Sequence, residues 1–322
     1  MRKEHIEFNS LNMKNLLLLT AAFLLFCSHD MFLKMNTFFL QPNTIATLLL
    51  YNGTFDNSEN AIARKRMRDV SLVGNGARLH PDSSQWTEVD SVTVLNFKTG
   101  DPGTWVAGLS THPNNIELTA KEFNEYLEHD GVLDMLEWRK QNNALDKNAV
   151  EKYSKHVKAV FQVGNAKTDD WKSVLGYPIE FVPETNPYDL SIGETLRVKL
   201  LYKGQPLANQ LVYAGFGAEG HTHSPDGEGH QHNDVKLQTG ADGVVALKVD
   251  HEGQWFLRTI HMALSNEPGL THESNWATLT FEAGHGHAHS HSHGMPAFIV
   301  YLMGGLAVFT LAFCWFRLKP GR

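Results

Sequence analysis

The sequence is poor in cysteine. Its 322 residues include two cysteines, Cys27 and Cys314. Cys27 closes an apolar stretch near the N-terminus, and Cys314 lies in a second apolar stretch near the C-terminus. The long region between them has no cysteine, so we expect it to fold without disulfide bonds.

Positive charge and catalytic motifs are also scarce. The formal net charge is −7, and the basic residues form one group, at residues 64–68, which we interpret as an exposed loop. An acidic chain of this kind is not expected to bind nucleic acid. The sequence contains no zinc-hydrolase helix, P-loop, dinucleotide-binding motif or nucleophile elbow, so we do not expect an enzyme.

The N-terminal apolar stretch is typical of an export signal. A short basic start at Met13 precedes the apolar residues 16–26, and Ser28 follows where a signal peptidase could cut. Because the residues before Met13 include two glutamates, we expect translation to begin at Met13. We assign residues 1–28 as a signal peptide. An uncleaved anchor and a lipidated Cys27 are the alternatives.

The C-terminal apolar stretch predicts a membrane anchor. Residues 297–316 carry no charge, and a helix of this length spans the roughly 30 Å hydrocarbon core of a bilayer. Basic side chains in residues 317–322 favour a cytoplasmic tail. We therefore expect a bacterial inner-membrane protein with one transmembrane helix and with its main domains facing the periplasm.

Between the two ends, the sequence predicts a mainly β fold. Short segments rich in β-branched and aromatic residues, separated by Gly, Asn, Asp and Pro turns, predict antiparallel strands. We expect an N-terminal β-domain at residues 29–164, a linker at 165–177 and a C-terminal β-domain at 178–283. The C-terminal domain has about seven predicted strands, which is the count of an immunoglobulin-like sandwich. Two β-sandwich domains of this type are therefore the expected fold.

A helical insertion is predicted within the N-terminal domain, at residues 119–156. Thr119 followed by Glu122 has the pattern of a capping box, and the apolar residues after it fall on one helix face. A glycine ends this helix, and residues 132–140 and 146–156 predict two further helical pieces.

Histidines are concentrated in two tracts. A Gly-rich loop, residues 219–233, interrupts the C-terminal domain, and a juxtamembrane tract, residues 284–296, precedes the predicted anchor. Neutral imidazole binds zinc, copper and nickel, and a flexible backbone lets several imidazoles converge on one ion. Loose sites of this kind suit the collection of ions. A solvated spacer and a pH sensor are the alternatives. The candidate ligands are His221, His223, His230 and His232 in the loop and His285, His287, His289, His291 and His293 in the tract.

His29 is a more specific candidate. Cleavage after Ser28 would make it the first residue of the mature chain, where its imidazole and free α-amino group could chelate copper or nickel through two nitrogens. A residue without function beside the cleavage site is the alternative. His261 and His272 are each either a ligand or a hydrogen-bonded structural histidine. Four isolated histidines are interpreted as surface residues: His80, His112, His129 and His156.

Several segments together resemble a known bacterial family. They are His29-Asp30-Met31-Phe32-Leu33, Thr104-Trp105-Val106-Ala107, Tyr153-Ser154-Lys155, Phe161-Gln162-Val163-Gly164, Gly204-Gln205-Pro206-Leu207, Asp242-Gly243 and Gly253-Gln254-Trp255. The pattern is similar to the family called domain of unknown function 4198, over most of residues 29–283. That family is similar to the periplasmic components of cobalt and nickel uptake systems. The resemblance therefore implies a periplasmic, β-rich metal-binding protein in which His29 and His261 are candidate ligands. The His-rich segments and the C-terminal helix depart from the family's soluble members and favour a tethered protein.

We therefore predict a membrane-anchored periplasmic protein that captures a divalent transition-metal ion, which is nickel, cobalt, zinc or copper, and passes it to an inner-membrane transporter. The alternative is a non-enzymatic structural or adhesion module of two β-domains on a membrane stalk, in which the histidines have no role.

Overall fold

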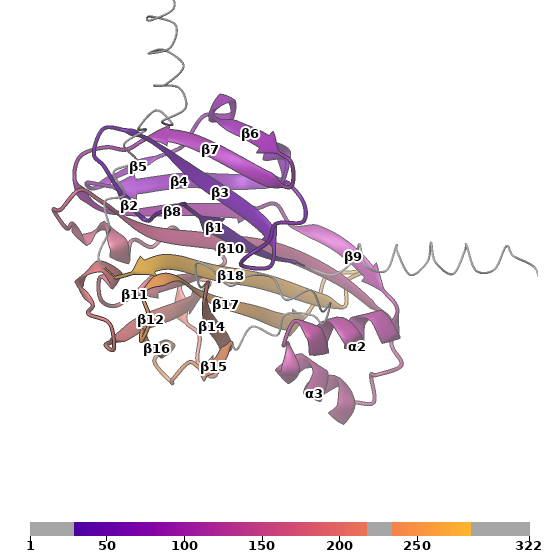
Figure 1. Ribbon diagram of the computed structural model, residues 1–322. Helices are drawn as coiled ribbons and strands as arrows, with labels where there is room; N and C mark the ends of the chain where they lie inside the picture. Colours follow the sequence, from indigo (N-terminus) through magenta and orange to yellow (C-terminus); the bar gives the residue numbers. More distant parts are fainter. Residues whose placement is uncertain (1–28, 218–233, 285–322) are drawn as a thin grey trace, which may run out of the picture. The chain divides into compact units, whose positions relative to one another are not determined.

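The computed structural model describes residues 29–217 and 234–284. These residues form mainly β-strands arranged in three sheets, with two α-helices at one end (Figure 1). The predicted mainly β fold is confirmed.

The largest sheet has ten strands in the described residues, and they come from both halves of the chain. Eight of them follow the order β15-β14-β17-β18-β10-β8-β4-β5, and β2 and β9 each pair with β10. The strands are β2 (Phe39–Leu40), β4 (Met67–Gly74), β5 (Ala77–Leu79), β8 (Gly103–Thr111), β9 (Asn114–Leu118), β10 (Ala149–Val163), β14 (Leu211–Gly217), β15 (Val235–Gln238), β17 (Gly253–Leu264) and β18 (His272–Ala283).

Two four-stranded sheets complete the β structure of the described residues. The first has the order β1-β3-β7-β6, and in the second β12 pairs with β11, β13 and β16. Their strands are β1 (Asp30–Lys34), β3 (Ile45–Gly53), β6 (Trp86–Val89), β7 (Val92–Lys98), β11 (Ile179–Pro183), β12 (Thr195–Tyr202), β13 (Gln205–Pro206) and β16 (Val244–Lys248). Short 3-10 helices lie in the connections, at η1 (Arg64–Arg66), η2 (Ser83–Gln85), η3 (Asp169–Lys172) and η4 (Pro187–Asp189).

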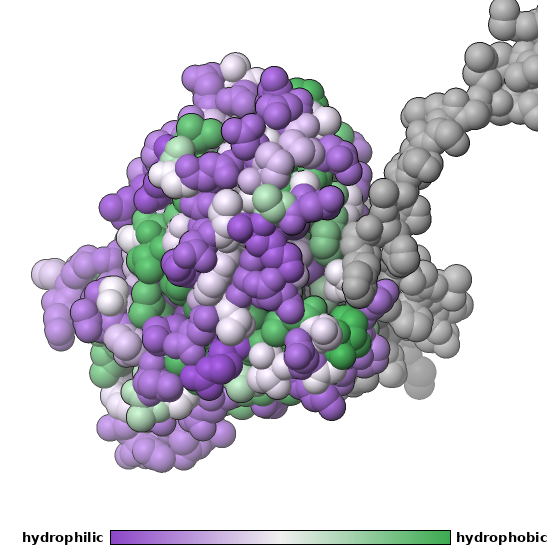
Figure 2. Space-filling model, turned by 90° about the vertical axis from the view of Figure 1, so that its left-hand side faces the viewer, coloured by the Kyte–Doolittle hydropathy of each residue, from purple (hydrophilic) through white to green (hydrophobic). Residues whose placement is uncertain are grey.

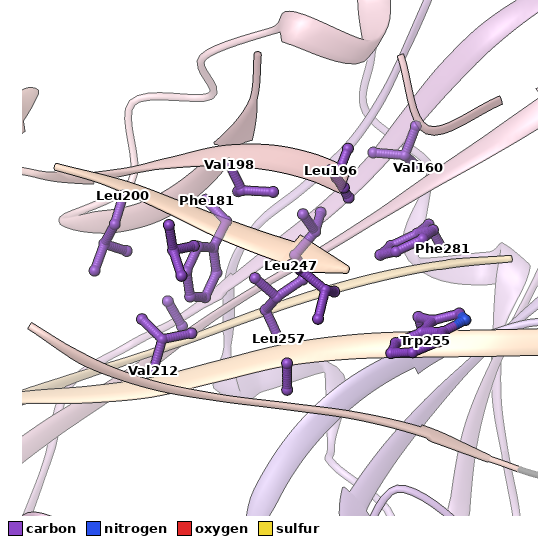
Figure 3. Packing of buried hydrophobic residues seen from close by; sticks show 14 of the residues in the cluster. Val160, Phe181, Leu196, Val198, Leu200, Val212, Leu247, Trp255, Leu257 and Phe281 are labelled. Atoms are coloured by element: carbon purple, nitrogen blue, oxygen red, sulfur yellow. The ribbon is translucent and has the colours of Figure 1, made fainter. Parts of the chain in front are cut away.

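The ten-stranded sheet is the central sheet of the fold. It is covered on both faces, because its strands direct alternate residues into two cores. Trp105 of β8 and Phe161 of β10 belong to the core shared with the β1-β3-β7-β6 sheet. The neighbouring residues Val106 and Val160 belong to the core shared with the β11-β12-β16 strands. Figure 3 shows this second core, in which Val160 lies in one cluster with side chains of the small sheet.

The hydropathy of the surface agrees with the burial of apolar side chains in these cores. The face shown in Figure 2, at the end of the fold opposite to the helices, is mostly hydrophilic, and its hydrophobic residues form separate patches. Most large apolar side chains of the described residues are instead buried in the cores.

The two halves of the chain meet in a parallel strand pair. Residues 151–159 of β10 pair with residues 272–280 of β18. Residues 29–164 and 178–283, which we predicted as two domains, therefore contribute strands to one continuous sheet. The connection at residues 165–177 is docked on this sheet, since the Asp170 carboxylate accepts hydrogen bonds from the main-chain N–H groups of Asn75 and Gly76 at 2.8 and 2.9 Å.

The helical insertion is shorter than predicted. It consists of α2 (Ala120–His129) and α3 (Leu133–Gln141). The predicted capping box is confirmed, because Thr119 caps α2 and Glu122 accepts a hydrogen bond from the Thr119 N–H at 2.8 Å. The prediction of a third helical piece at residues 146–156 is wrong. Strand β10 begins at Ala149 and pairs with β9 and β18, and these long-range contacts override the local helical pattern.

Several predictions concern residues that the structure does not describe. The signal peptide at residues 1–28, the His-rich loop at 219–233, and the juxtamembrane tract, transmembrane helix and tail within 285–322 lie outside the described residues. Within residues 29–217 and 234–284, no helix is both long and apolar enough to cross a membrane.

A buried ion pair joins the central sheet to the second small sheet. Lys158 Nζ lies 3.0 Å from Glu180 Oε2, and the two side chains are 1% and 2% exposed. Glu180 also accepts hydrogen bonds from the N–H groups of Leu175 and Gly176, at 2.9 and 2.8 Å. This carboxylate therefore holds the end of the connection between the two halves of the chain.

We predict that Lys158→Met lowers the free energy of unfolding by about 3–5 kcal/mol, because it leaves the Glu180 charge buried and unpaired. Urea unfolding at pH 7 measures the loss. The matched change Lys248→Met, on the exposed face of β16, should cost less than about 0.5 kcal/mol. Similar small losses for the two variants would contradict the prediction.

Candidate ligand-binding site

A cavity of about 1000 Å³ lies at the helical end of the fold. Strand β10 is longer than its partner β8, which pairs only with residues 160–163. The first half of β10 is instead covered by β9, which pairs with residues 149–153. Side chains of β1, β3, β9, β10 and α2 and of residues 60–66 surround the space that this extension leaves.

One face of β10 forms part of the cavity wall. Glu151, Tyr153 and Lys155 alternate along the strand, and all three line the cavity. The next residues in the same alternation, Val157 and Ala159, enter the apolar core under the first small sheet. The same strand face is therefore polar at the cavity and apolar in the core.

His29 lines the cavity at the start of β1. Its imidazole Nε2 lies 3.0 Å from Glu59 Oε2, and its side chain is 15% exposed. Burial is the main cause that lowers the pKa of His29, and the nearby Lys155 adds to it, whereas Glu59 acts in the opposite direction. The neutral form of the imidazole is therefore favoured, and this is the form that can bind a metal ion.

Lys155 holds the main chain of His29 in place. Its ammonium group donates to the carbonyl oxygen of His29 and, at 3.3 Å, to Asn52 Oδ1. The same group lies 4.9 Å from the centre of the Trp276 ring. Burial lowers the pKa of Lys155 to about 8.

Glu151 is a buried acid beside the same space. Its carboxylate accepts hydrogen bonds from the hydroxyl groups of Tyr126, at 3.1 Å, and Ser274. Burial raises the pKa of Glu151 to about 7, although the two hydroxyl groups favour its ionised form.

The end of α2 contributes a second acid. Asp130 Oδ1 lies 2.9 Å from His129 Nδ1. Asp130 Oδ2 is buried and has no hydrogen-bond partner among the described residues. Burial raises the pKa of Asp130, against the opposing effects of His129 and Arg258.

The second predicted ligand, His261, lies elsewhere. Its Nδ1 is 2.9 Å from Gln210 Oε1, its ring contacts the Tyr202 ring at 4.4 Å, and burial lowers its pKa. It is not among the residues that line the cavity around His29. His272 is also buried, and its ring packs on Phe123 at 4.6 Å.

The described residues contain no cluster of three or more His, Cys, Asp or Glu side chains that could hold a metal ion. The structure therefore does not bring His29 and His261 into one ligand set. The nine candidate histidines of the two tracts lie outside the described residues.

Of the four histidines predicted at the surface, His156 is buried instead. His80, His112 and His129 are exposed, but His156 is 2% exposed. Its Nδ1 contacts Ser110 Oγ at 2.9 Å and its Nε2 contacts Ser154 Oγ at 3.0 Å. Burial lowers the pKa of His156 to about 4, so it is a neutral structural residue. The prediction was wrong because it rested on the isolation of His156 in the sequence, whereas His156 lies in the buried part of β10.

Sequence reasoning missed most of the cavity wall. Asp130 and Glu151, which line the cavity, and Glu59, which pairs with His29, belong to no local motif and come together through strand pairing and loop placement. Lys155 lies in a segment that resembles the family, but nothing in that segment indicated its contact with His29. The alternation of Glu151, Tyr153 and Lys155 was the available signal, but the helical interpretation of residues 146–156 concealed it.

Comparisons with known proteins identify a family but no function. The family model described as Domain of unknown function (DUF4198) matches residues 27–263. A search of curated proteins finds no match.

Three solved structures illustrate the structural neighbours. The D0-D1 domain of intimin is 11% identical, with a TM-score of 0.17, and the match covers 78% of this chain and 97% of that one. Trypsin-activated alpha-2-macroglobulin from Escherichia coli is 10% identical, with a TM-score of 0.19, over 79% of this chain and 16% of that one. The Escherichia coli adhesin FdeC is 12% identical, with a TM-score of 0.20, over 78% of this chain and 64% of that one. These TM-scores are too low to support an argument about shared fold or function.

Glu151 should make the stability of the protein depend on pH. Because its folded-state pKa of about 7 lies above the usual 4.5, stability should fall as pH rises from about 4.5 to 7, by about 3 kcal/mol from this group. Glu151→Gln should remove this component, so that the variant gains stability relative to the parent as pH rises. Thermal and urea unfolding between pH 5 and 8 measure the difference.

The control is Glu125→Gln, which changes an exposed acid of α2 at the cavity edge. It should leave the pH profile of the parent intact. A profile that is identical in the parent and Glu151→Gln would show that Glu151 is not held in its protonated form by burial.

Proposed function

The chain belongs to the DUF4198 family, and we propose that it is a binding protein that captures a divalent transition-metal ion beside His29. Nickel, cobalt, zinc and copper are the candidate ions. The ion is then passed to an inner-membrane transporter.

The single observation that carries the proposal is the environment of His29. This is the residue that would begin the mature chain, and it lies in a cavity wall with its imidazole 3.0 Å from a Glu59 carboxylate oxygen. Removal of residues 1–28 would add a free α-amino nitrogen at the same place. Imidazole, amine and carboxylate form a donor set that suits the late first-row divalent ions.

The surroundings of His29 support an ordered site. Its main-chain carbonyl is held by Lys155, and the next residue, Asp30, pairs with Gly53 of β3. Asp30 Oδ2 also lies 3.3 Å from Arg258 Nη1. A fixed backbone keeps the donor atoms in place, whereas ligands on a flexible tract bind loosely.

The low pKa of His29 supports capture at neutral pH. A proton and a metal ion compete for the same imidazole nitrogen, so a depressed pKa reduces this competition. Glu59 and Asp30 both place negative charge near His29, and this favours a bound cation. The Lys155 ammonium opposes it, and its lowered pKa weakens this opposition.

The two His-rich tracts have a separate role in the proposal. Histidines 221, 223, 230 and 232 and the five at positions 285–293 collect ions loosely and raise their local concentration near the ordered site. The apolar residues 297–316 anchor the protein beside the transporter.

We predict that His29→Ala weakens one tight metal site at least tenfold, about 1.4 kcal/mol, because it removes the imidazole donor. Glu59→Gln should weaken the same site, and so should one glycine added before His29, since it moves the free amine. Isothermal titration of the full-length mature protein with each ion, after purification without affinity resin, measures these effects. The loose sites should remain in all three variants.

His80→Ala is the matched control, since His80 is an exposed histidine whose Nδ1 lies 3.3 Å from an Asp69 carboxylate oxygen. It should leave the tight site unchanged. Failure to find any site tighter than that of an unstructured His-rich peptide would overturn the proposal. A melting temperature that none of the four ions changes would then favour the structural or adhesion module built from immunoglobulin-like domains.

A further inference from the structure

The cavity is far larger than a metal ion requires. Its volume of about 1000 Å³ lies at the upper end of the range for sites that bind small organic molecules, about 300–1000 Å³. Its wall combines four apolar side chains, Met31, Ile62, Ile116 and Leu118, with two tyrosines and with polar and charged groups. This combination is typical of sites in which apolar contacts bind the body of a ligand and polar groups orient it.

The cavity contains a cation without a partner. Arg66, in η1, lines the cavity and is partly buried. Within residues 29–217 and 234–284, no side chain or carbonyl forms a hydrogen bond or ion pair with its guanidinium group. A guanidinium group in this position can bind a carboxylate through two parallel hydrogen bonds.

The cavity also contains an acid with an unused oxygen. Asp130 lines the same space, its side chain is 11% exposed, and its buried Oδ2 has no hydrogen-bond partner in the described part of the chain. A buried carboxylate oxygen without a donor is costly, at about 1–3 kcal/mol or more. A ligand ammonium group beside this carboxylate would lower this cost.

The two groups line the same cavity. Arg66 and Asp130 both interact electrostatically with the buried Lys155 on the cavity wall. Lys155 itself is already occupied by the His29 carbonyl and Asn52. The unused positive group and the unused acid group therefore belong to the wall of one cavity.

We propose that this cavity binds a small zwitterion of the amino-acid type, whose carboxylate pairs with Arg66 and whose ammonium group pairs with Asp130. The apolar part of the wall favours a hydrophobic amino acid or a short hydrophobic peptide. Tyr126 and Tyr153, which also line the cavity, provide aromatic surface for the body of the ligand. This binding goes beyond metal capture and requires no metal ion.

The test uses the full-length protein in buffer that contains EDTA, so that metal capture does not contribute. The probes are L-phenylalanine, L-leucine and L-leucyl-L-leucine, measured by isothermal titration. At least one of them should bind with a dissociation constant below about 1 mM. Two analogues of L-phenylalanine separate its charges: 2-phenylethylamine lacks the carboxylate, and 3-phenylpropionate lacks the amine. If L-phenylalanine is a ligand, each analogue should bind at least tenfold more weakly than L-phenylalanine, because each leaves either Arg66 or Asp130 unpaired.

Two variants assign the charges. Arg66→Gln removes the partner of the carboxylate, so the variant should bind L-phenylalanine no more tightly than 2-phenylethylamine. It should still bind L-phenylalanine more tightly than 3-phenylpropionate. Asp130→Asn should have the opposite pattern. A general disturbance of the fold would weaken all three compounds alike. The controls are Arg68→Gln and Asp146→Asn, which change exposed side chains of the same types and should leave all affinities unchanged.

The proposal is overturned if none of the three zwitterions binds below about 1 mM, or if either analogue binds as tightly as L-phenylalanine when L-phenylalanine binds. It is also overturned if Arg66→Gln and Asp130→Asn change all affinities equally. Metal titrations without EDTA form a separate arm, so the failure of zwitterion binding and the failure of metal capture are distinguishable.

Discussion

The parallel pairing of β10 with β18 is the constraint on which the rest of the structure depends. It joins residues 151–159 to residues 272–280, so the two halves of the chain share one sheet. The same strand directs Phe161 into one core and Val160 into the other. At its other end, β10 presents Glu151 and Lys155 to the cavity. A single strand thus contributes to both hydrophobic cores and to the candidate site.

The position of the cavity follows from the lengths of the elements. The N-terminal residues of β10 continue beyond the part that pairs with β8, and β9 and α2 cover this extension. Charged groups there are buried without being packed in a core, and burial shifts the pKa of Glu151 up and that of Lys155 down. Perturbed titratable groups that converge in one cavity are characteristic of functional sites, although structural ion pairs can produce similar shifts. Lys158 and Glu180 are such a structural pair, because they join two sheets outside the cavity lining.

Local sequence signals predicted the fold more successfully than they predicted the site. Neighbouring residues determine the capping box of Thr119 and Glu122, so the start of α2 could be predicted. The β-rich composition likewise predicted the mainly β fold. The start of β10 was assigned to a helix because its strand character comes from pairing with distant residues. His29 could be identified from its place after the predicted leader. Its contacts could not, since Lys155 is 126 residues away in the sequence. Asp130 and Arg66 have no motif that would indicate a shared cavity.

The central claim is that the exported chain begins at His29 and holds its ligand in the cavity beside this residue. Native mass spectrometry tests this most directly, on protein released from its own membrane and purified without affinity resin. The account predicts an intact mass that starts at His29 and one divalent transition-metal ion that remains after dialysis against a weak chelator. A mature chain that starts at another residue, or a chain that retains no ion after this dialysis, would contradict the account.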